Sequence, residues 1–368
     1  MPCRSILHLL KNLKAESSVM LEKYLSLLVC PVTRTELMLK KISVKTKLFR
    51  SGEKEIIHEG ILFAEKDWYY PIIDGVPRML VESFLDYEDF LKKNLSDHEG
   101  RREGLLTLYP ELIQQSVKKN KRTKKSFELE WSLFNYEEDK TWELKGEELL
   151  DRFLKETDET KNSLHGKLIF DAGCGNGQLN QYIAQCGATV VGMDLSKSVE
   201  RANANNKEEK AFFLQADVQH PPLRFKSYDI VHSSGVLICT NNSEKTFSGI
   251  EPFVKKQGKL SVWLYHPRKN FIHNTFNFLR KFTSKLPVKF QYYLYLLTIF
   301  PASYLIKRIN GNKQNAREMM ISIMDWFSPE FRWEHTHEEA TSWFTKRNYN
   351  DVKITTTDTF GFNIIGKK

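Results

Sequence analysis

The sequence predicts an α/β protein built on a seven-stranded sheet, in which five parallel strands are followed by a terminal antiparallel pair. Two observations predict this sheet: short apolar runs alternate with helical stretches from Lys167 to Tyr265, and the chain ends in two tightly joined strand-like segments. The 368 residues leave room for about two domains at roughly 150 residues each. With 41% hydrophobic and 27% charged residues, the composition is that of a folded chain and excludes the disordered and fibrous classes.

The strands are predicted from short apolar runs. These runs lie in the segments KLIFDAG, ATVVGMDLS, AFFLQADV, SYDIVHSSG and GKLSVWLY. Apolar runs of this length, separated by helical stretches, are typical of parallel strands that are buried on both faces. The segments VKITTTD and FGFNIIGK predict the antiparallel pair. We therefore place the core of the fold in residues 156–266 and 331–368, with its last helix starting near Thr336.

Four further segments differ from this alternation. Residues 1–27 predict an N-terminal helix, and residues 28–80 predict a small β module, because short alternating runs there end in turn residues. Residues 81–155 have apolar residues spaced three and four apart, which predicts a helical linker. Residues 267–330 predict a basic and aromatic helical insert. We expect this insert to form a lid, because loops and insertions on a rigid scaffold commonly set substrate choice.

The formal net charge of +9 is concentrated in the insert. Residues 267–320 contain ten Lys or Arg against one acid, Glu318, so this segment alone carries 10 − 1 = +9. A second cluster, residues 118–125, has six basic residues in eight. Basic surfaces attract phosphate groups, but a run of charges is also typical of a solvated helix face. Three interpretations of the insert stay open: a lid, a surface for an anionic membrane that admits a lipophilic acceptor, and an RNA-binding surface.

Cysteine usage and the length of the apolar runs indicate the compartment. The five cysteines include no CxxC pair, so neither a disulfide framework nor a complete zinc site is predicted. We see no secretion signal at the start of the chain. The longest apolar stretch, Tyr292–Ile306, is shorter than the roughly 20 residues that cross a bilayer. We therefore expect a cytoplasmic protein, with peripheral membrane contact through residues 267–320 as a further expectation.

The segment Phe170–Gly177, FDAGCGNG, ends the first predicted parallel strand and opens a helix. Its three alternate glycines allow a sharp turn and a close approach of the backbone to a ligand, at a point that the N–H groups of the helix also face. Asp194 ends the second strand, where its carboxylate can accept hydrogen bonds from both hydroxyls of a ribose. Asp217 follows the third strand, where it can meet the exocyclic amine of an adenine, with Leu195 and Val218 as apolar walls. The pattern predicts a nucleoside-like ligand.

These three motifs resemble those of the class I S-adenosylmethionine-dependent methyltransferases, whose core is a Rossmann-like sheet. FDAGCGNG, GMDLS and QADV match the glycine loop and the two acids of that family, and YDIVHSSGVL and QGKLSV match its fourth and fifth strands. The resemblance covers roughly residues 150–266 and the last 35 residues. It implies S-adenosylmethionine as cofactor, held by Asp171, Gly173, Cys174, Gly175, Gly177, Asp194, Leu195, Asp217, Val218 and Ser233. A dinucleotide site is disfavoured, because its fingerprint is GxGxxG.

A second resemblance lies in the β module. LLVCPVTRTELML and YPIIDGVPRML are similar to the beginning and end of the small zinc-ribbon domain of methyltransferase activator proteins. That family has paired cysteines, whereas here Cys30 stands alone and Thr33 occupies the place of its partner. We therefore expect no metal in this module and expect it to serve packing or substrate contact.

The implied reaction needs little covalent help, because the methyl group of a sulfonium is already activated and has only to be aligned with a nucleophile. A hydroxyl or an acidic carbon would also need a base. The candidates are His266, His232 and Tyr265, followed by Ser233, Ser234, His335 and His337. Residues of these types more often form structural hydrogen bonds than act in catalysis, so no catalytic base is assigned.

The sequence thus predicts a methyltransferase that acts on an oxygen or carbon atom of a small or lipophilic acceptor. An RNA methyltransferase, for instance one acting on tRNA, is the alternative, and a non-catalytic binding or scaffold protein with the same fold is a second one. The fourth strand lacks the Asp/Asn-Pro-Pro-Tyr sequence that aligns amine nucleophiles, which argues against N-methylation of adenine or glutamine. The aromatic cluster between Trp326 and Trp333 predicts either an anchor for the lid or a wall of the substrate pocket.

Overall fold

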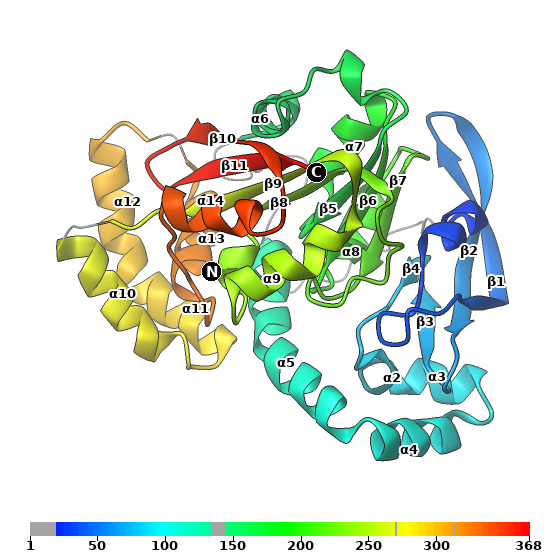
Figure 1. Cartoon of the computed structure of the whole chain (residues 1–368). Coiled ribbons are helices and arrows are strands. Elements are labelled where there is room, and N and C mark those ends of the chain that lie inside the picture. The colour runs from blue at the N-terminus through cyan, green and yellow to red at the C-terminus, as the bar shows by residue number, and fades with distance from the viewer. Residues whose placement is uncertain (1–19, 134–143, 269–270, 313) are drawn as a thin grey trace.

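The computed structural model describes residues 20–133, 144–268, 271–312 and 314–368 (Figure 1). Within this part of the chain, the central sheet has seven strands in the order β10-β11-β9-β8-β5-β6-β7. These are β5 (Leu168–Ala172), β6 (Thr189–Asp194), β7 (Ala211–Gln215), β8 (Tyr228–Ser234), β9 (Val254–Tyr265), β10 (Asn350–Thr357) and β11 (Gly361–Lys367). Strands β5 to β9 are parallel, and β11 is antiparallel to both β9 and β10. The predicted α/β fold is confirmed.

Helices pack on both faces of this sheet, because its strands are apolar on both sides. They are α6 (Glu147–Thr157), α7 (Gln178–Gln185), α8 (Ser198–Asn205), α9 (Ser243–Ile250) and α14 (His337–Thr345). Side chains of α6 and α7, such as Phe153 and Ile183, share one buried cluster with β5 and β6. Side chains of α9 and α14, such as Phe247 and Trp343, belong to a second and larger cluster on the sheet. The Thr336 side chain caps α14 at the predicted start of the last helix.

The segment predicted as a β module contains four antiparallel strands, which form a separate sheet at the right of Figure 1. They are β1 (Met38–Phe49), β2 (Gly52–Phe63), β3 (Tyr69–Ile73) and β4 (Val76–Pro77), preceded by the 3₁₀ turn η1 (Glu22–Leu27). The backbone N–H of Met79 donates to the carbonyl of Gln215 at 2.7 Å, so the module covers the outer edge of β7. Cys30 is buried, and its Sγ lies 3.3 Å from the Tyr70 hydroxyl. The predicted helix over residues 1–27 lies largely outside the described residues.

The predicted helical linker contains one long helix that crosses the molecule. The helices here are α2 (Ser83–Asp86), α3 (Glu88–Asn94), α4 (His98–Leu108) and α5 (Pro110–Leu133). Helix α5 packs against α8 of the core and against α11 and α13 of the insert, so it is more than a linker. It carries the basic cluster of residues 118–125, part of which is turned inward: Lys124 pairs with Glu82 at 3.0 Å, and Lys119 pairs with Asp217.

The insert consists of helices α10 (Phe271–Thr283), α11 (Val288–Leu297), α12 (Ile299–Ile309) and α13 (Ala316–Phe327). A capping box between Asn315 and Glu318 begins α13, whose Met324 and Phe327 pack on Tyr295 of α11. Phe327 therefore anchors the insert. Large apolar side chains of α10, α11 and α12 point outward, and α12 has no buried residue. No helix in the described ranges combines the length and the apolar character that crossing a membrane requires.

Candidate functional site

The glycine loop connects β5 to α7 and adopts a conformation that favours glycine. Gly173, Gly175 and Gly177 have φ angles of +99°, +54° and +70°. A Cβ atom on Gly175 would lie 2.2 Å from the ring of Trp131, which reaches the loop from α5. A Cβ atom on Gly177 would lie 2.6 Å from the Cβ of Ala202 on α8. The loop therefore needs its glycines both for backbone geometry and for close packing.

Asp194 joins the end of β6 to this loop. Its carboxylate accepts hydrogen bonds from the backbone N–H of Gly175 at 3.0 Å and from the N–H and hydroxyl of Ser196 at 2.8 and 2.7 Å. Burial raises the pKa of the Asp194 carboxyl, and these hydrogen bonds oppose that rise. The side chain thus holds the loop in place while facing the pocket that the loop borders.

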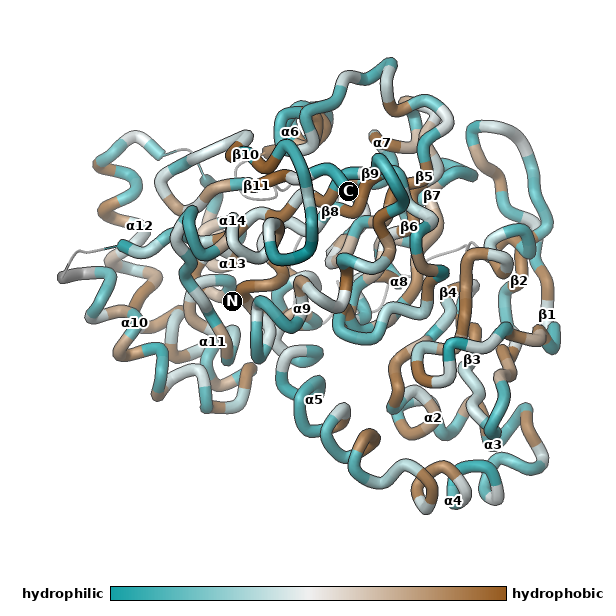
Figure 2. The backbone as a smooth tube through the Cα atoms, viewed as in Figure 1, coloured by the Kyte–Doolittle hydropathy of each residue, from teal (hydrophilic) through white to brown (hydrophobic). Residues whose placement is uncertain are grey.

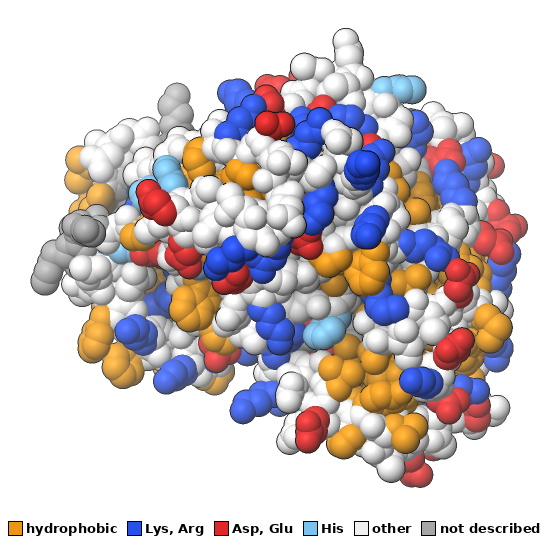
Figure 3. All heavy atoms as spheres, in the orientation of Figure 1, with side chains coloured by type: hydrophobic (Ala, Val, Ile, Leu, Met, Phe, Trp, Pro, Cys, Tyr) orange, Lys and Arg blue, Asp and Glu red, His pale blue; other side chains and the backbone are white. Residues whose placement is uncertain are grey.

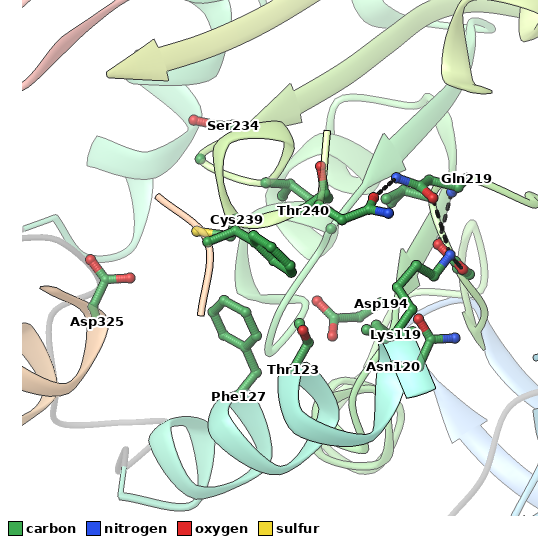
Figure 4. Close-up of a pocket in the computed structure, with 18 of the residues that line it drawn as sticks. Lys119, Asn120, Thr123, Phe127, Asp194, Gln219, Ser234, Cys239, Thr240 and Asp325 are labelled. Carbon is green, nitrogen blue, oxygen red and sulfur yellow. Dashed lines mark hydrogen bonds and ion pairs between the residues drawn. The ribbon is translucent and has the colours of Figure 1, made fainter. Parts of the chain in front are cut away.

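Asp217 lies just after β7 and is nearly fully buried. One carboxylate oxygen accepts from the backbone N–H of Gln219 at 2.9 Å, and the other accepts from the ammonium group of Lys119 (Figure 4). Burial raises the pKa of this carboxyl, but His220 and Lys119 outweigh that effect and hold the pKa well below its usual range. Asp217 is therefore a carboxylate, and Lys119 occupies the place at which we expect an adenine amine.

A pocket with about 100 Å³ of free space lies between the glycine loop, α5 and α13. The predicted cofactor residues that line it are Gly173, Asp194, Leu195, Asp217 and Val218. Ser234, one of the minor candidates, also lines it, as does Phe331 of the aromatic cluster. Figure 4 shows Gln219 and Lys119 at one end of the pocket and Asp325 at the opposite end, with Asp194 between them.

Other predicted cofactor residues lie behind the pocket wall. Ser233 is buried and its hydroxyl donates to the carbonyl of Ala172 at 2.8 Å. Asp171 is buried and accepts a hydrogen bond from Asn180 at 3.0 Å. The thiol of Cys174 is turned into the protein, and burial raises its pKa. In this structure these residues, with Gly175 and Gly177, shape the loop.

His232 on β8 is part of a buried ionic network. Its Nδ1 lies 3.1 Å from Asp171 and its Nε2 lies 2.9 Å from Glu156 of α6, and Glu156 also pairs with Arg152 at 2.7 Å. Burial lowers the pKa of this imidazole, but hydrogen bonds to the two carboxylates outweigh it and raise the pKa to about 9. His232 is thus positioned to join the strands to α6, and it does not line the pocket.

The remaining candidates for a base also lie away from the pocket lining. His266 is half-buried, and its ring contacts the backbone carbonyls of Pro267 and Asp358 at 3.3 Å. Tyr265 is buried, and the guanidinium of Arg332 lies 4.0 Å above its ring. The rings of His335 and His337 pack on Trp343 and Phe362, respectively.

Sequence reasoning missed one wall of the pocket. This wall consists of α5 residues Lys119, Asn120, Thr123, Phe127 and Trp131, and it is completed by Asp325 of α13. Four of these α5 residues, at positions 119, 123, 127 and 131, are spaced four apart, which is a signal of a single helix face. Because this face mixes a cation, polar groups and aromatic rings, it does not stand out as an apolar stripe.

Comparisons with known proteins show which part of the chain resembles a known family. The sequence profile of the family described as "Methyltransferase domain" matches residues 170–262. An uncharacterized methyltransferase of Synechocystis is 32% identical over 110 residues, which cover 29% of this chain and 51% of that protein. A ubiquinone biosynthesis O-methyltransferase of Aliivibrio fischeri is 38% identical over 77 residues, which cover 20% of this chain and 33% of that protein. The match thus spans about half, or less, of the length of these curated relatives.

Among solved structures, magnesium protoporphyrin IX methyltransferase from Synechocystis with bound SAH is 19% identical, with a TM-score of 0.34. The alignment covers 56% of this chain and 75% of that chain. The matched family and the strand order together define residues 170–262 as part of a class I S-adenosylmethionine-dependent methyltransferase domain. The family match does not extend to the N-terminal sheet.

Proposed function

We propose that the protein transfers the methyl group of S-adenosylmethionine to an oxygen atom of a small, lipophilic acceptor. The observation that carries this proposal is the placement of Gly173, Asp194 and Asp217 along one pocket. An acid at each of two successive strand ends suits the ribose and the adenine of the cofactor. The relatives named as O-methyltransferases support oxygen as the acceptor atom.

The polar groups of the pocket fit the cofactor, but its present volume does not. Ligand pockets commonly have roughly 300 Å³ or more, against about 100 Å³ here. Lys119 and Trp131 of α5 fill part of the space, next to Asp217 and Gly175 respectively. We infer that this face of α5 moves outward when the cofactor enters and that Lys119 then leaves Asp217.

In the proposed reaction, the bound cofactor supplies a methyl group on a positively charged sulfur. Asp194 would hold the ribose hydroxyls and Asp217 the adenine amine, while Leu195 and Val218 contact the ring. The aromatic side chains of Phe127 and Phe331 would exclude water from the reacting end and orient an apolar acceptor.

Titration calorimetry of the protein with S-adenosylmethionine and S-adenosylhomocysteine tests this function. We expect micromolar binding of both. Lys119→Met should raise the affinity by roughly 10-fold or more, because the cofactor no longer has to displace a hydrogen bond between charged groups, worth about 1.5–3 kcal/mol. Lys118→Met is a matched control, since Lys118 is exposed on the same helix. Absence of binding to the wild-type protein would contradict the proposed function.

We further propose that the acceptor is taken from an anionic membrane surface. We define the apolar-basic face by the exposed side chains Phe278, Leu279, Phe282, Phe290, Tyr293, Leu297, Leu305, Ile306 and Ile309, with Lys281, Lys285, Lys289 and Arg308 among them. Leu297 and Ile309 are 78% and 75% exposed. In Figure 3, orange and blue side chains gather at the lower left, over α10 and α11 of Figure 1. Figure 2 shows the same mixture of apolar and polar residues along these helices.

A surface that is both apolar and cationic matches the interface of an anionic bilayer better than it matches RNA, because apolar side chains can enter the acyl region. We expect the protein to sediment with phosphatidylglycerol vesicles and much less with phosphatidylcholine vesicles. Phe282→Ser combined with Leu297→Ser should lower vesicle binding about 100-fold, since each change removes roughly 1.5 kcal/mol of apolar transfer.

Leu48→Ser is the control, because Leu48 is 70% exposed on β1, far from the insert. Equal binding of the wild-type protein to both vesicle types would refute the anionic surface. Strong binding to tRNA that the two serine substitutions abolish would instead favour the RNA alternative.

A further inference from the structure

A buried glutamine, Gln215, connects the end of β7 to two other stretches of the chain. It is the last residue of β7 and is 1% exposed. Its amide oxygen accepts a hydrogen bond from the Tyr87 hydroxyl at 2.5 Å, and its amide nitrogen donates to the carbonyl of Leu195 at 3.0 Å. Its backbone carbonyl accepts from the N–H of Met79 at 2.7 Å. The side chain thus joins the segment before α3 to the turn that follows β6.

The orientation of the Gln215 amide follows from what its partners can do. The carbonyl of Leu195 can only accept, so the amide nitrogen faces it and the amide oxygen faces Tyr87. The Tyr87 hydroxyl is therefore the donor. Burial raises the pKa of this hydroxyl, and the charge of Arg78, whose guanidinium lies 5.2 Å from the ring centre, opposes the rise. Tyr87 keeps its proton and can hold Gln215 in this orientation.

The contacts of Gln215 lie between the two acids that border the pocket. Leu195 follows Asp194 directly and lines the pocket. The N–H of Ala216, the residue after Gln215, donates to the carbonyl of Asp194 at 3.0 Å. Asp217 comes one residue later and lines the same pocket. The hydrogen bonds of Gln215 therefore fix the chain at the place where both carboxylates reach the pocket.

Tyr87 lies outside residues 170–262, which match the methyltransferase family. It stands between α2 and α3 and is partly buried. The ammonium group of Lys197 lies 5.8 Å from the centre of its ring, within the range of a cation–π contact. Lys197 belongs to the same connection between β6 and α8 as Leu195. Tyr87 thus contacts this connection both through Gln215 and through its own ring.

We propose that Tyr87 and Gln215 are positioning residues of the cofactor site. They hold the carbonyl of Leu195, and with it the turn that presents Asp194 and Leu195 to the nucleoside part of the cofactor. A site that is held in place before binding loses less conformational freedom when the ligand enters. Affinity for the cofactor then depends on a hydroxyl outside the family match. This inference rests on the proposed methyltransferase function.

Titration calorimetry with S-adenosylhomocysteine tests the two residues. Tyr87→Phe keeps the ring and removes the hydroxyl, and it should weaken binding by about three- to fivefold, close to the worth of one ordinary hydrogen bond. Gln215→Met removes both side-chain hydrogen bonds and should weaken binding by about tenfold or more. Urea unfolding of each variant shows that the protein remains folded under the conditions of the titration.

Tyr69→Phe is the matched control. The Tyr69 hydroxyl lies 3.0 Å from Nδ1 of His98 in a buried contact of the N-terminal region, and neither residue lines the pocket. The change removes a tyrosine hydroxyl without altering the end of β7. Its affinity for S-adenosylhomocysteine should stay within about twofold of the wild type, because no contact of the pocket is lost.

A second ligand separates positioning from a general loosening of the fold. The 2′-deoxy form of S-adenosylhomocysteine lacks one of the ribose hydroxyls that Asp194 would bind. In Gln215→Met, the loss of affinity for the complete ligand should exceed the loss for the deoxy form by about threefold, because a displaced Asp194 matters only where the hydroxyl is present. A general loosening would weaken both ligands equally.

Three results would overturn the inference. They are unchanged affinity in both Tyr87→Phe and Gln215→Met, an equal loss for the complete and the deoxy ligand in Gln215→Met, and a loss in Tyr69→Phe as large as in Tyr87→Phe. Failure of the wild-type protein to bind S-adenosylhomocysteine is a different result, which would contradict the proposed function itself.

Discussion

Replacement of Asp194 by Ala is expected to reduce the affinity for S-adenosylmethionine by roughly 100-fold or more. Two hydrogen bonds from ribose hydroxyls to a charged acceptor are worth about 1.5–3 kcal/mol each, and about 1.4 kcal/mol corresponds to a tenfold change. The same change also removes the acceptor of the 3.0 Å hydrogen bond from the backbone N–H of Gly175. The glycine loop then loses its hydrogen bond to the end of β6. Titration calorimetry with the cofactor measures this loss.

Ser196→Ala is a milder change at the same site. It leaves the Asp194 carboxylate in place and removes one hydrogen bond, of 2.7 Å, that supports it. We expect a loss of only a few-fold in affinity, because this hydrogen bond supports the carboxylate without contacting the cofactor. If Asp194→Ala binds the cofactor as tightly as the wild type, the ribose site is assigned to the wrong residue.

Replacement of His232 by Phe is expected to lower the free energy of unfolding by about 3–5 kcal/mol, the usual cost of removing one partner from a buried ion pair. The change leaves the carboxylates of Asp171 and Glu156 buried with fewer partners. Urea unfolding followed by circular dichroism measures the loss. The double variant His232→Phe, Glu156→Leu should lose less than the sum of the two single variants, because one uncompensated charge is removed with its partner.

The pH dependence of stability follows from the same histidine. Its folded-state pKa is raised from 6.5 to about 9, so the folded protein binds its proton more tightly than the unfolded chain does. The stabilisation is fully present below about pH 6.5 and is lost as the pH rises to about 9. Between these values, unfolding free energies of the wild type should fall with pH more steeply than those of His232→Phe. Parallel curves would show that His232 carries no proton in the folded state.

The fold was predictable from the sequence because each of its strands can be recognised from a short stretch of neighbouring residues. Each parallel strand is a short apolar run, and the glycine loop and Asp194 stand at the ends of two of them. The α5 wall was not predictable in this way, because Lys119 meets Asp217 across 98 positions of the chain. Asp325 is an acid inside a basic segment, and only the packing of α13 on α5 brings it to the pocket. Such contacts depend on how helices dock rather than on their own periodicity.

Helix α5 has a mechanical consequence, because it is a single rod of 24 residues, about 36 Å long. Its N-terminal end contacts α4, and its C-terminal half, from Lys119 onward, lines the pocket. The helix also packs on α11 and α13. Because a straight helix moves as one body, movement of α5 also moves the insert helices α11 and α13 that pack on it. Under the proposed outward movement of the Lys119 to Trp131 face, the insert would be displaced as well, which would couple cofactor entry to the placement of the apolar-basic face.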